Sequence, residues 1–187
     1  RLILDASVFA WALQSGSRDR QVGSSFGRPH RDDGFSDCHG ADGQLSVLSV
    51  WVPVVDVTTQ NGCMYVVPAS HDPLFDRPSH RLHMQPERDV PWAHVRALPA
   101  AAGDVLMWKG NLIHWGASCD DGIDEPRKSV ASAFFTPSAA AAQGISRERL
   151  RAGMDLSTRL RLIVRALLTY EHWHPDFEGI DSLRGAI

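Results

Sequence analysis

The hydrophobic pattern of the chain predicts short strands separated by turns. Residues 45–57 are rich in Val, Leu and Trp, which favours a strand. Asn61-Gly62 follows, and residues 63–68 return to an apolar run. Asn-Gly between two such runs is the strongest short-range signal for a hairpin, so we expect these two segments to pair as antiparallel strands.

The pattern predicts further strands at residues 103–108, 112–117 and 129–136, each set off by residues that favour turns. Residues 5–14 fit a short helix or a strand equally well. Residues 69–99 hold five prolines and four histidines with little periodicity, which indicates a long loop. Loops of this length in compact domains are usually functional, for example as lids over sites.

The last part of the chain has helical periodicity. Residues 157–172 place five apolar side chains at the spacing of one helix face: Leu160, Ile163, Val164, Leu167 and Leu168. We expect this amphipathic helix to pack on the outside of a sheet, and Ser146 ahead of charged residues indicates an earlier helix start. Strands followed by helix predict a mainly β protein, a β-sandwich or jelly roll with a C-terminal helical cover.

Composition narrows the function classes. The 187 residues are 43% hydrophobic and 22% charged, which fits one soluble globular domain. A formal net charge of −3 gives no reason to expect nucleic acid or a membrane as partner. No apolar run approaches the roughly 20 residues that cross a bilayer. We expect no signal peptide, because the chain reaches Asp5 almost at once.

The three cysteines also bear on the compartment in which the protein works. Cys38, Cys63 and Cys119 form no metal-type CxxC spacing, and an odd count fits reduced thiols in a cytoplasmic protein. We expect all three to be buried or half-buried side chains. The sequence does not indicate an oligomeric state.

Three residues far apart in the chain carry candidate chemistry. His30 and Asp32 lie in the run Pro-His-Arg-Asp, within a polar loop that precedes the predicted strand 45–57, and His114 lies in a later strand. Two imidazoles and one carboxylate form the facial triad that holds non-haem Fe(II) and leaves the opposite face open. On a strand, residues two apart point to one face, so His30 and Asp32 could reach one metal ion.

Two further features bear on this interpretation. A second His-x-Asp triplet, His174-Pro175-Asp176, follows the predicted helix, and its proline disfavours a regular ladder, so we do not expect it to bind metal. Arg127 follows the second histidine of the candidate triad. Its guanidinium could hold the free carboxylate of a keto-acid cosubstrate through two parallel hydrogen bonds.

Several motifs appear together in a characteristic order. They are Pro29-His30-Arg31-Asp32, Trp51, Asn61-Gly62-Cys63-Met64-Tyr65-Val66-Val67-Pro68-Ala69-Ser70-His71, Gly103-Asp104-Val105-Leu106, His114 and Arg127. In this order the chain resembles the phytanoyl-CoA dioxygenase-like oxygenases, which depend on Fe(II) and 2-oxoglutarate. The run Val-Val-Pro-x-Ser-His is especially similar, with Ala69 where glycine is usual in the family.

The resemblance implies a fold and a set of roles. It implies a double-stranded β-helix (jelly roll), iron held by His30, Asp32 and His114, and 2-oxoglutarate held by Arg127 with help from Ser129. It also implies a dioxygenase that acts on a small-molecule substrate with O₂. Asp32 occupies the ligand position that related halogenases leave open for chloride, so hydroxylation is the expected outcome.

The resemblance covers residues 26–137, and we expect residues 1–187 to form a single oxygenase domain with a helical extension over about 146–187. The chain begins at Arg1 without Met, and only 29 residues precede His30, so we expect a partial sequence or a pared-down member. Two alternatives stay open. One is a cupin-like metalloenzyme that does not use 2-oxoglutarate, and the other is an inactive or partial jelly-roll binding domain.

Overall fold

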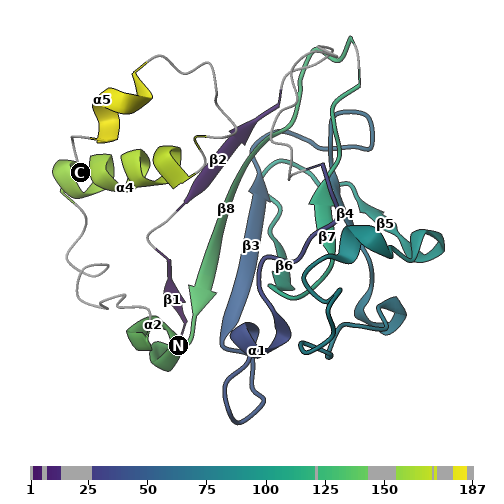
Figure 1. Cartoon of the computed structure of the whole chain (residues 1–187). Coiled ribbons are helices and arrows are strands. Elements are labelled where there is room, and N and C mark those ends of the chain that lie inside the picture. Colours follow the sequence, from purple (N-terminus) through teal and green to yellow (C-terminus); the bar gives the residue numbers. More distant parts are fainter. Residues whose placement is uncertain are drawn as a thin grey trace.

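The computed structural model describes residues 2–5, 8–13, 27–120, 122–142, 155–169, 171 and 179–184. Two antiparallel sheets form the body of the protein, and helices from the end of the chain lie to one side of it (Figure 1). This arrangement confirms the predicted mainly β class.

The larger sheet is built around one long strand. Strand β8 (Lys128–Phe135) pairs with both β1 (Ile3–Leu4) and β2 (Phe9–Ala12) on one side, and with β3 (Val47–Pro53) on the other. Strand β6 (Leu106–Lys109) completes the sheet by pairing with β3. Residues 9–12, within the segment that fitted a helix or a strand equally well, therefore form a strand, and this strand pairs with β8.

The smaller sheet holds three strands. Strand β4 (Met64–Val66) lies between β5 (Arg96–Leu98) and β7 (His114–Gly116). On the side of β7 away from β4, His30 forms an isolated bridge with His114. The segment around His30 therefore extends this sheet by a single residue pair.

The main core lies between the two sheets. Its fully buried members come from both: Trp51, Val57, Cys63, Met64 and Trp108. Cys38 and Cys63 are buried free thiols and Cys119 is half-buried, as the sequence indicated. Burial raises the pKa of the Cys38 thiol to about 12, which keeps it protonated.

The predicted hairpin is wrong. Strand β3 belongs to the larger sheet and β4 to the smaller one, so the two do not pair. The turn itself exists, because Gly62 has a φ of 101° and the Asn61 Oδ1 accepts a hydrogen bond from the Thr58 N–H at 2.7 Å. However, β3 ends at Pro53, too early for a two-residue hairpin loop, and the turn instead carries the chain from one sheet to the other.

The long loop contains three short 3₁₀ helices, η1 (Ala69–His71), η2 (Pro86–Arg88) and η3 (Trp92–His94). It packs against the outer face of the smaller sheet, where one buried cluster joins Val67, Val90, Ile113 and Trp115. The side chains of successive strand residues alternate, so this face is opposite to the one that carries the His114 imidazole. The loop therefore covers the back of the sheet and is not a lid over the histidine.

Four helices of the described chain complete the fold: α1 (Phe35–Cys38), α2 (Pro137–Ala142), α4 (Leu156–Thr169) and α5 (Ile180–Arg184). Helix α4 lies beside β2 (Figure 1). A hollow between them is lined by apolar residues of both, namely Val8, Phe9, Ala10 and Trp11 on one side and Ile163, Ala166 and Leu167 on the other.

Helix α4 forms where the periodicity predicted it, but its packing is looser than expected. Leu160 is 52% exposed and Ile163 is 56% exposed, although both belong to the predicted buried face. The predicted helix start at Ser146 and the triplet His174-Pro175-Asp176 lie outside the described residues.

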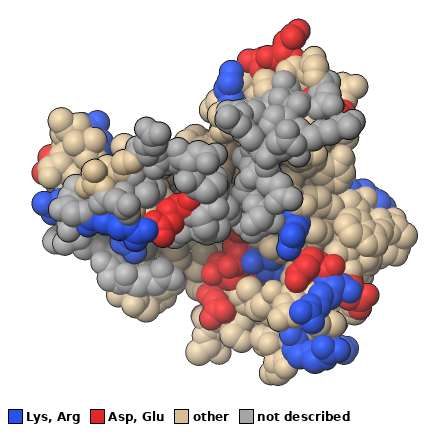
Figure 2. All heavy atoms as spheres, turned by 45° about the horizontal axis from the view of Figure 1, so that its top comes forward, with Lys and Arg blue, Asp and Glu red and all other residues tan. Residues whose placement is uncertain are grey.

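The surface carries both signs of charge. Figure 2 shows acidic and basic side chains intermingled over the coloured part of one face, consistent with the small net charge of −3. Among the described helices, none is long and apolar enough to span a membrane.

Trp51 provides a test of this core. Its side chain is 3% exposed and belongs to the buried cluster that joins both sheets, so Trp51→Ala is expected to lower the free energy of unfolding by about 3–5 kcal/mol. Val54, 54% exposed, is the control, and Val54→Ala should change it by less than about 0.5 kcal/mol. Urea denaturation measures both, and equal effects would contradict the assigned core.

Candidate metal centre

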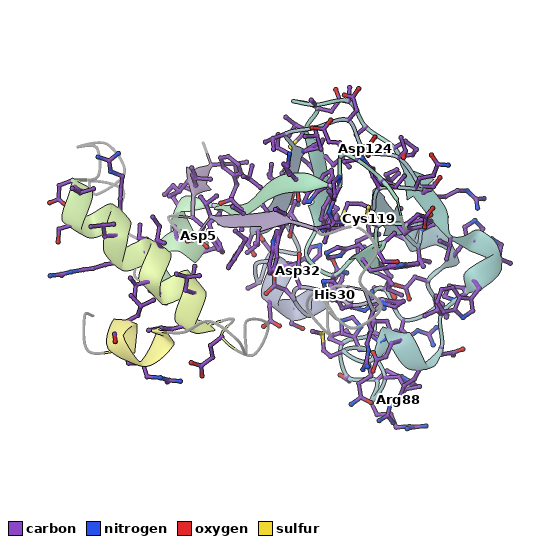
Figure 3. The ribbon with its side chains drawn as sticks, turned by 90° about the horizontal axis from the view of Figure 1, so that it is seen from above. Asp5, His30, Asp32, Arg88, Cys119 and Asp124 are labelled. Carbon is purple, nitrogen blue, oxygen red and sulfur yellow. The ribbon has the colours of Figure 1, made fainter. Side chains whose placement is uncertain are left out.

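Three side chains with metal-binding atoms converge at the edge of the smaller sheet. The Nε2 atoms of His30 and His114 lie 3.6 and 3.5 Å from the Asp32 Oδ1. One ligand atom from each residue lies within 4.8 Å of the other two. In the described part of the chain, this is the one group of three or more such residues that could hold a metal ion, and Figure 3 shows His30 and Asp32 side by side.

The backbone brings these residues together. The His30 N–H donates to the His114 carbonyl and the His114 N–H donates back, both at 3.0 Å. The Asp32 N–H donates to the carbonyl of Gly110, in the turn that precedes β7, at 2.9 Å. The sequence placed His30 and Asp32 in a polar loop, and the structure has a one-residue bridge at His30 followed by a bend.

Both imidazoles are oriented by backbone carbonyls. His30 Nδ1 lies 2.9 Å from the Arg28 carbonyl, and His114 Nδ1 lies 2.9 Å from the Leu112 carbonyl. A carbonyl only accepts, so each Nδ1 carries a proton and the lone pair of a neutral ring is on Nε2, facing Asp32. Two lone pairs and a carboxylate oxygen that face one another form a donor set suited to a cation.

The pKa shifts of His30 and Asp32 reflect how close the three groups lie to one another. Burial lowers the pKa of His30, but the hydrogen bond and charge of Asp32, together with the Arg28 carbonyl, outweigh it and raise the pKa overall. Partial burial raises the pKa of Asp32, and His114 and His30 outweigh it, so that the pKa is well below its usual range. Asp32 is therefore an ionised ligand candidate at neutral pH.

The cluster is open on one side. The side chain of His114 is 4% exposed, whereas those of His30 and Asp32 are 30% and 38% exposed. Behind it, the Trp108 ring lies 4.8 Å from the His114 ring and forms an apolar wall. A ligand could therefore approach from the solvent side while the sheet side stays closed.

Ser49 is a part of the site that sequence reasoning missed. Its hydroxyl, on the buried face of β3, donates to the Asp32 Oδ2 at 2.9 Å and leaves Oδ1 facing the two imidazoles. A signal was available in the sequence, because Ser49 alternates with Val47 and Trp51 on a face of the strand that is otherwise apolar.

The Arg127 guanidinium lies over the face of β7 that carries the His114 side chain. It is 2% exposed, and its Nη1 donates to the Gly62 carbonyl at 2.6 Å. A Cβ built on Gly116 would lie 2.2 Å from that Nη1, so the guanidinium lies directly over this glycine. Gly116 is two residues beyond His114, which separates their positions by about 7 Å along one face of the strand.

The Arg127 guanidinium has no counter-ion among the described residues. None of the described carboxylates lies within ion-pair distance of it, and its buried Nε has no hydrogen-bond partner among the described residues. Burial lowers its pKa to about 10, still far above neutral, so the group is charged. Ser129, two residues on, is also 2% exposed, and its Oγ lacks a partner within the described structure. A buried cation beside unsatisfied donors is suited to an anionic ligand.

The histidines of the long loop are not members of this cluster. His71 stacks on His94 with ring centroids 3.8 Å apart, and His83 is hydrogen-bonded within the loop. These contacts are made within the loop itself.

Comparison with known proteins identifies the family. The sequence model described as phytanoyl-CoA dioxygenase (PhyH) matches residues 6–118, more than half of the chain. The chain belongs to this family. The resemblance found from the motifs is thereby confirmed, and a search of curated protein sequences gives no match.

Solved structures of PhyH-like fold resemble the chain. EvdMO1 has a TM-score of 0.51 at 18% identity, covering 73% of this chain and 28% of EvdMO1. The epimerase SnoN from nogalamycin biosynthesis, described as non-heme and alpha ketoglutarate dependent, has a TM-score of 0.45 at 27% identity over 68% of this chain and 45% of SnoN. AviO1 from Streptomyces viridochromogenes Tue57 has a TM-score of 0.49 at 18% identity, covering 73% of this chain and 52% of AviO1. The chain thus spans about half or less of these proteins, and the EvdMO1 match supports the jelly-roll fold.

Ser49 can be tested with a divalent metal as the probe. Ser49→Ala frees the Asp32 carboxylate to rotate, so we expect binding of Co²⁺ to weaken about 10- to 100-fold. Ser132→Ala, on the neighbouring strand, is the control and should leave the affinity unchanged. Calorimetric titration measures both, and an unchanged affinity in Ser49→Ala would show that Asp32 does not need this hydrogen bond.

Proposed function

We propose that this chain is the catalytic domain of an Fe(II)- and 2-oxoglutarate-dependent dioxygenase that hydroxylates a small molecule. The observation that carries the proposal is the buried Arg127 guanidinium, which has no carboxylate partner among the described residues and lies over the face of β7 that carries the His114 imidazole. Membership of the PhyH family supports this class of reaction. A metal-binding jelly roll that did not use a keto acid would have no use for a buried cation at this position.

In this proposal His30, Asp32 and His114 hold the iron ion. The donor set fits Fe(II), because two neutral imidazoles and one carboxylate are the protein ligands of the facial triad. Bound iron and 2-oxoglutarate supply, with O₂, the oxidation that converts a substrate C–H bond into C–OH, with release of succinate and CO₂.

Arg127 and Ser129 bind the far carboxylate of 2-oxoglutarate. The Arg127 Nε–H and the Ser129 hydroxyl are buried donors that need an acceptor, and a carboxylate satisfies both with charge-assisted hydrogen bonds. The spacing of about 7 Å along β7 suits a short dicarboxylate that reaches from the metal ligands to the guanidinium. The buried Trp108 ring lies beside the His114 ring, with centroids 4.8 Å apart, and adds an apolar surface on the inner side of the metal ligands.

An anaerobic titration with Fe(II) and 2-oxoglutarate tests the proposal. We expect a saturable visible charge-transfer band, which forms when a keto acid chelates iron. His114→Ala should abolish the band and leave a folded protein, and Arg127→Ala should weaken 2-oxoglutarate binding. If the folded protein gives no band, the chain is a metal-binding relative or a binding domain. A full band in His114→Ala would rule out the triad.

Gly116 offers a test in which none of the residues proposed to bind iron or 2-oxoglutarate is itself substituted. Gly116→Ala adds a Cβ where the Arg127 Nη1 lies, so the guanidinium must move. Losing a charge-assisted contact of about 1.5–3 kcal/mol predicts 2-oxoglutarate binding about 10- to 100-fold weaker, with Fe(II) affinity within about twofold.

Gly27→Ala is the matched control, because no described atom lies within 4 Å of the added Cβ. It should bind both Fe(II) and 2-oxoglutarate as the parent protein does. If Gly116→Ala also retains full 2-oxoglutarate affinity, then the cosubstrate does not use Arg127.

A further inference from the structure

A buried ion pair lies directly behind the proposed metal ligands. Arg31 stands between His30 and Asp32 in the sequence, and its side chain extends into the long loop, where it meets Asp72. The side chains of Arg31 and Asp72 are only 1% and 2% exposed. Such a pair is costly to bury, and replacement by apolar residues is often neutral for stability, so stability alone does not explain it.

The guanidinium of Arg31 is held by two carboxylate oxygens and two backbone carbonyls. Its Nη1 and Nη2 donate to the two oxygens of Asp72 at 2.7 and 3.0 Å. Its Nε donates to the His83 carbonyl at 2.7 Å, and Nη1 also donates to the Asn111 carbonyl at 2.5 Å. The fork geometry fixes the orientation of the side chain as well as its position.

The residues that receive Arg31 are themselves fixed. Asp72 Oδ1 also accepts from the Leu74 N–H at 3.0 Å. The His83 ring bonds to the Leu74 carbonyl through Nδ1 at 2.8 Å, and its Nε2 accepts from the Phe35 N–H at 3.1 Å. Phe35 follows soon after Asp32, so the network that starts at Arg31 returns to the ligand-bearing segment.

The same network reaches the other half of the triad. The Asn111 carbonyl, which accepts from Arg31, and the Gly110 carbonyl, which accepts from the Asp32 N–H, both belong to the turn that leads into β7. The Asn111 side-chain Nδ2 in turn donates to the Phe75 carbonyl at 2.9 Å. The turn that leads to His114 is thus fixed against the segment that carries His30 and Asp32.

We propose that Arg31 and Asp72 are positioning residues that set the geometry and the metal affinity of the His30, Asp32 and His114 site. This inference rests on the proposed metal-binding function. The long loop, which covers the back of the smaller sheet, thereby gains a role in the site: it supplies Asp72 and the His83 carbonyl that hold Arg31. Moving Arg31 shifts the backbone on which both neighbouring ligands stand.

Titration with Co²⁺ tests this, because its visible spectrum reports both binding and ligand geometry. Arg31→Lys keeps the charge but loses the fork, and Asp72→Asn keeps the shape but loses one charged acceptor. We expect Co²⁺ binding about 10- to 100-fold weaker in each variant, the effect usual for residues that orient metal ligands, together with an altered spectrum.

Val90→Ala is the matched control. Val90 is 8% exposed in the same loop and packs in the apolar cluster, and the hydrogen bonds that hold Arg31 do not involve it. Val90→Ala should lower the thermal unfolding midpoint. It should leave the Co²⁺ affinity within about twofold of the parent value and the Co²⁺ spectrum unchanged. This result would separate an effect on ligand positioning from an effect on stability.

The outcomes distinguish the two levels of inference. If the parent protein binds neither Co²⁺ nor Fe(II), the proposed function is wrong. If the parent binds and Arg31→Lys and Asp72→Asn match it in affinity and spectrum, the positioning role is overturned and the proposed function stands. If Arg31→Lys does not fold, Asp72→Asn alone decides, because its side chain keeps the same size and one acceptor oxygen.

Discussion

Two backbone hydrogen bonds between His30 and His114 join segments that lie far apart in the sequence. Because each residue both donates to and accepts from the other, the pairing fixes where the two imidazoles lie relative to each other. Asp32 follows through its own bond to the Gly110 carbonyl. The candidate metal centre therefore depends first on backbone pairing at the edge of the smaller sheet, and only then on side chains.

The two sheets contribute different parts of the site. The smaller sheet supplies His114 and the glycine over which the Arg127 guanidinium lies. The larger sheet supplies the Ser49 hydroxyl that orients Asp32 and, at the start of β8, the Arg127–Ser129 segment. A site assembled from two facing sheets keeps its geometry only while the core between them is packed, so the buried tryptophans of that core also support the chemistry.

The sequence predicted most strands and the convergence of His30, Asp32 and His114, but neither the sheet pairing nor the residues behind them. Asn61-Gly62 was a correct turn signal, yet local patterning cannot tell whether a turn joins paired strands or crosses between sheets. Ser49 was marked only by its position as a polar residue on an apolar strand face, which does not show what its hydroxyl contacts. The Arg31–Asp72 pair was hidden because its partners are distant in sequence, and neither residue type is expected to be fully buried.

The relation between His114 and Arg127 is set by the backbone of β7 more than by side-chain flexibility. A strand places residues two apart on one face at a fixed separation of about 7 Å. The imidazole occupies one of these positions, and at the other the absent side chain of Gly116 leaves room for the guanidinium of Arg127, the residue just before β8. A ligand that reaches from the metal ligands to the guanidinium must therefore span the separation of about 7 Å between these two strand positions. In the proposed function, that constraint favours a short dicarboxylate over a monocarboxylate, which could satisfy the metal ligands but would leave the buried charge of Arg127 without a partner among the described residues.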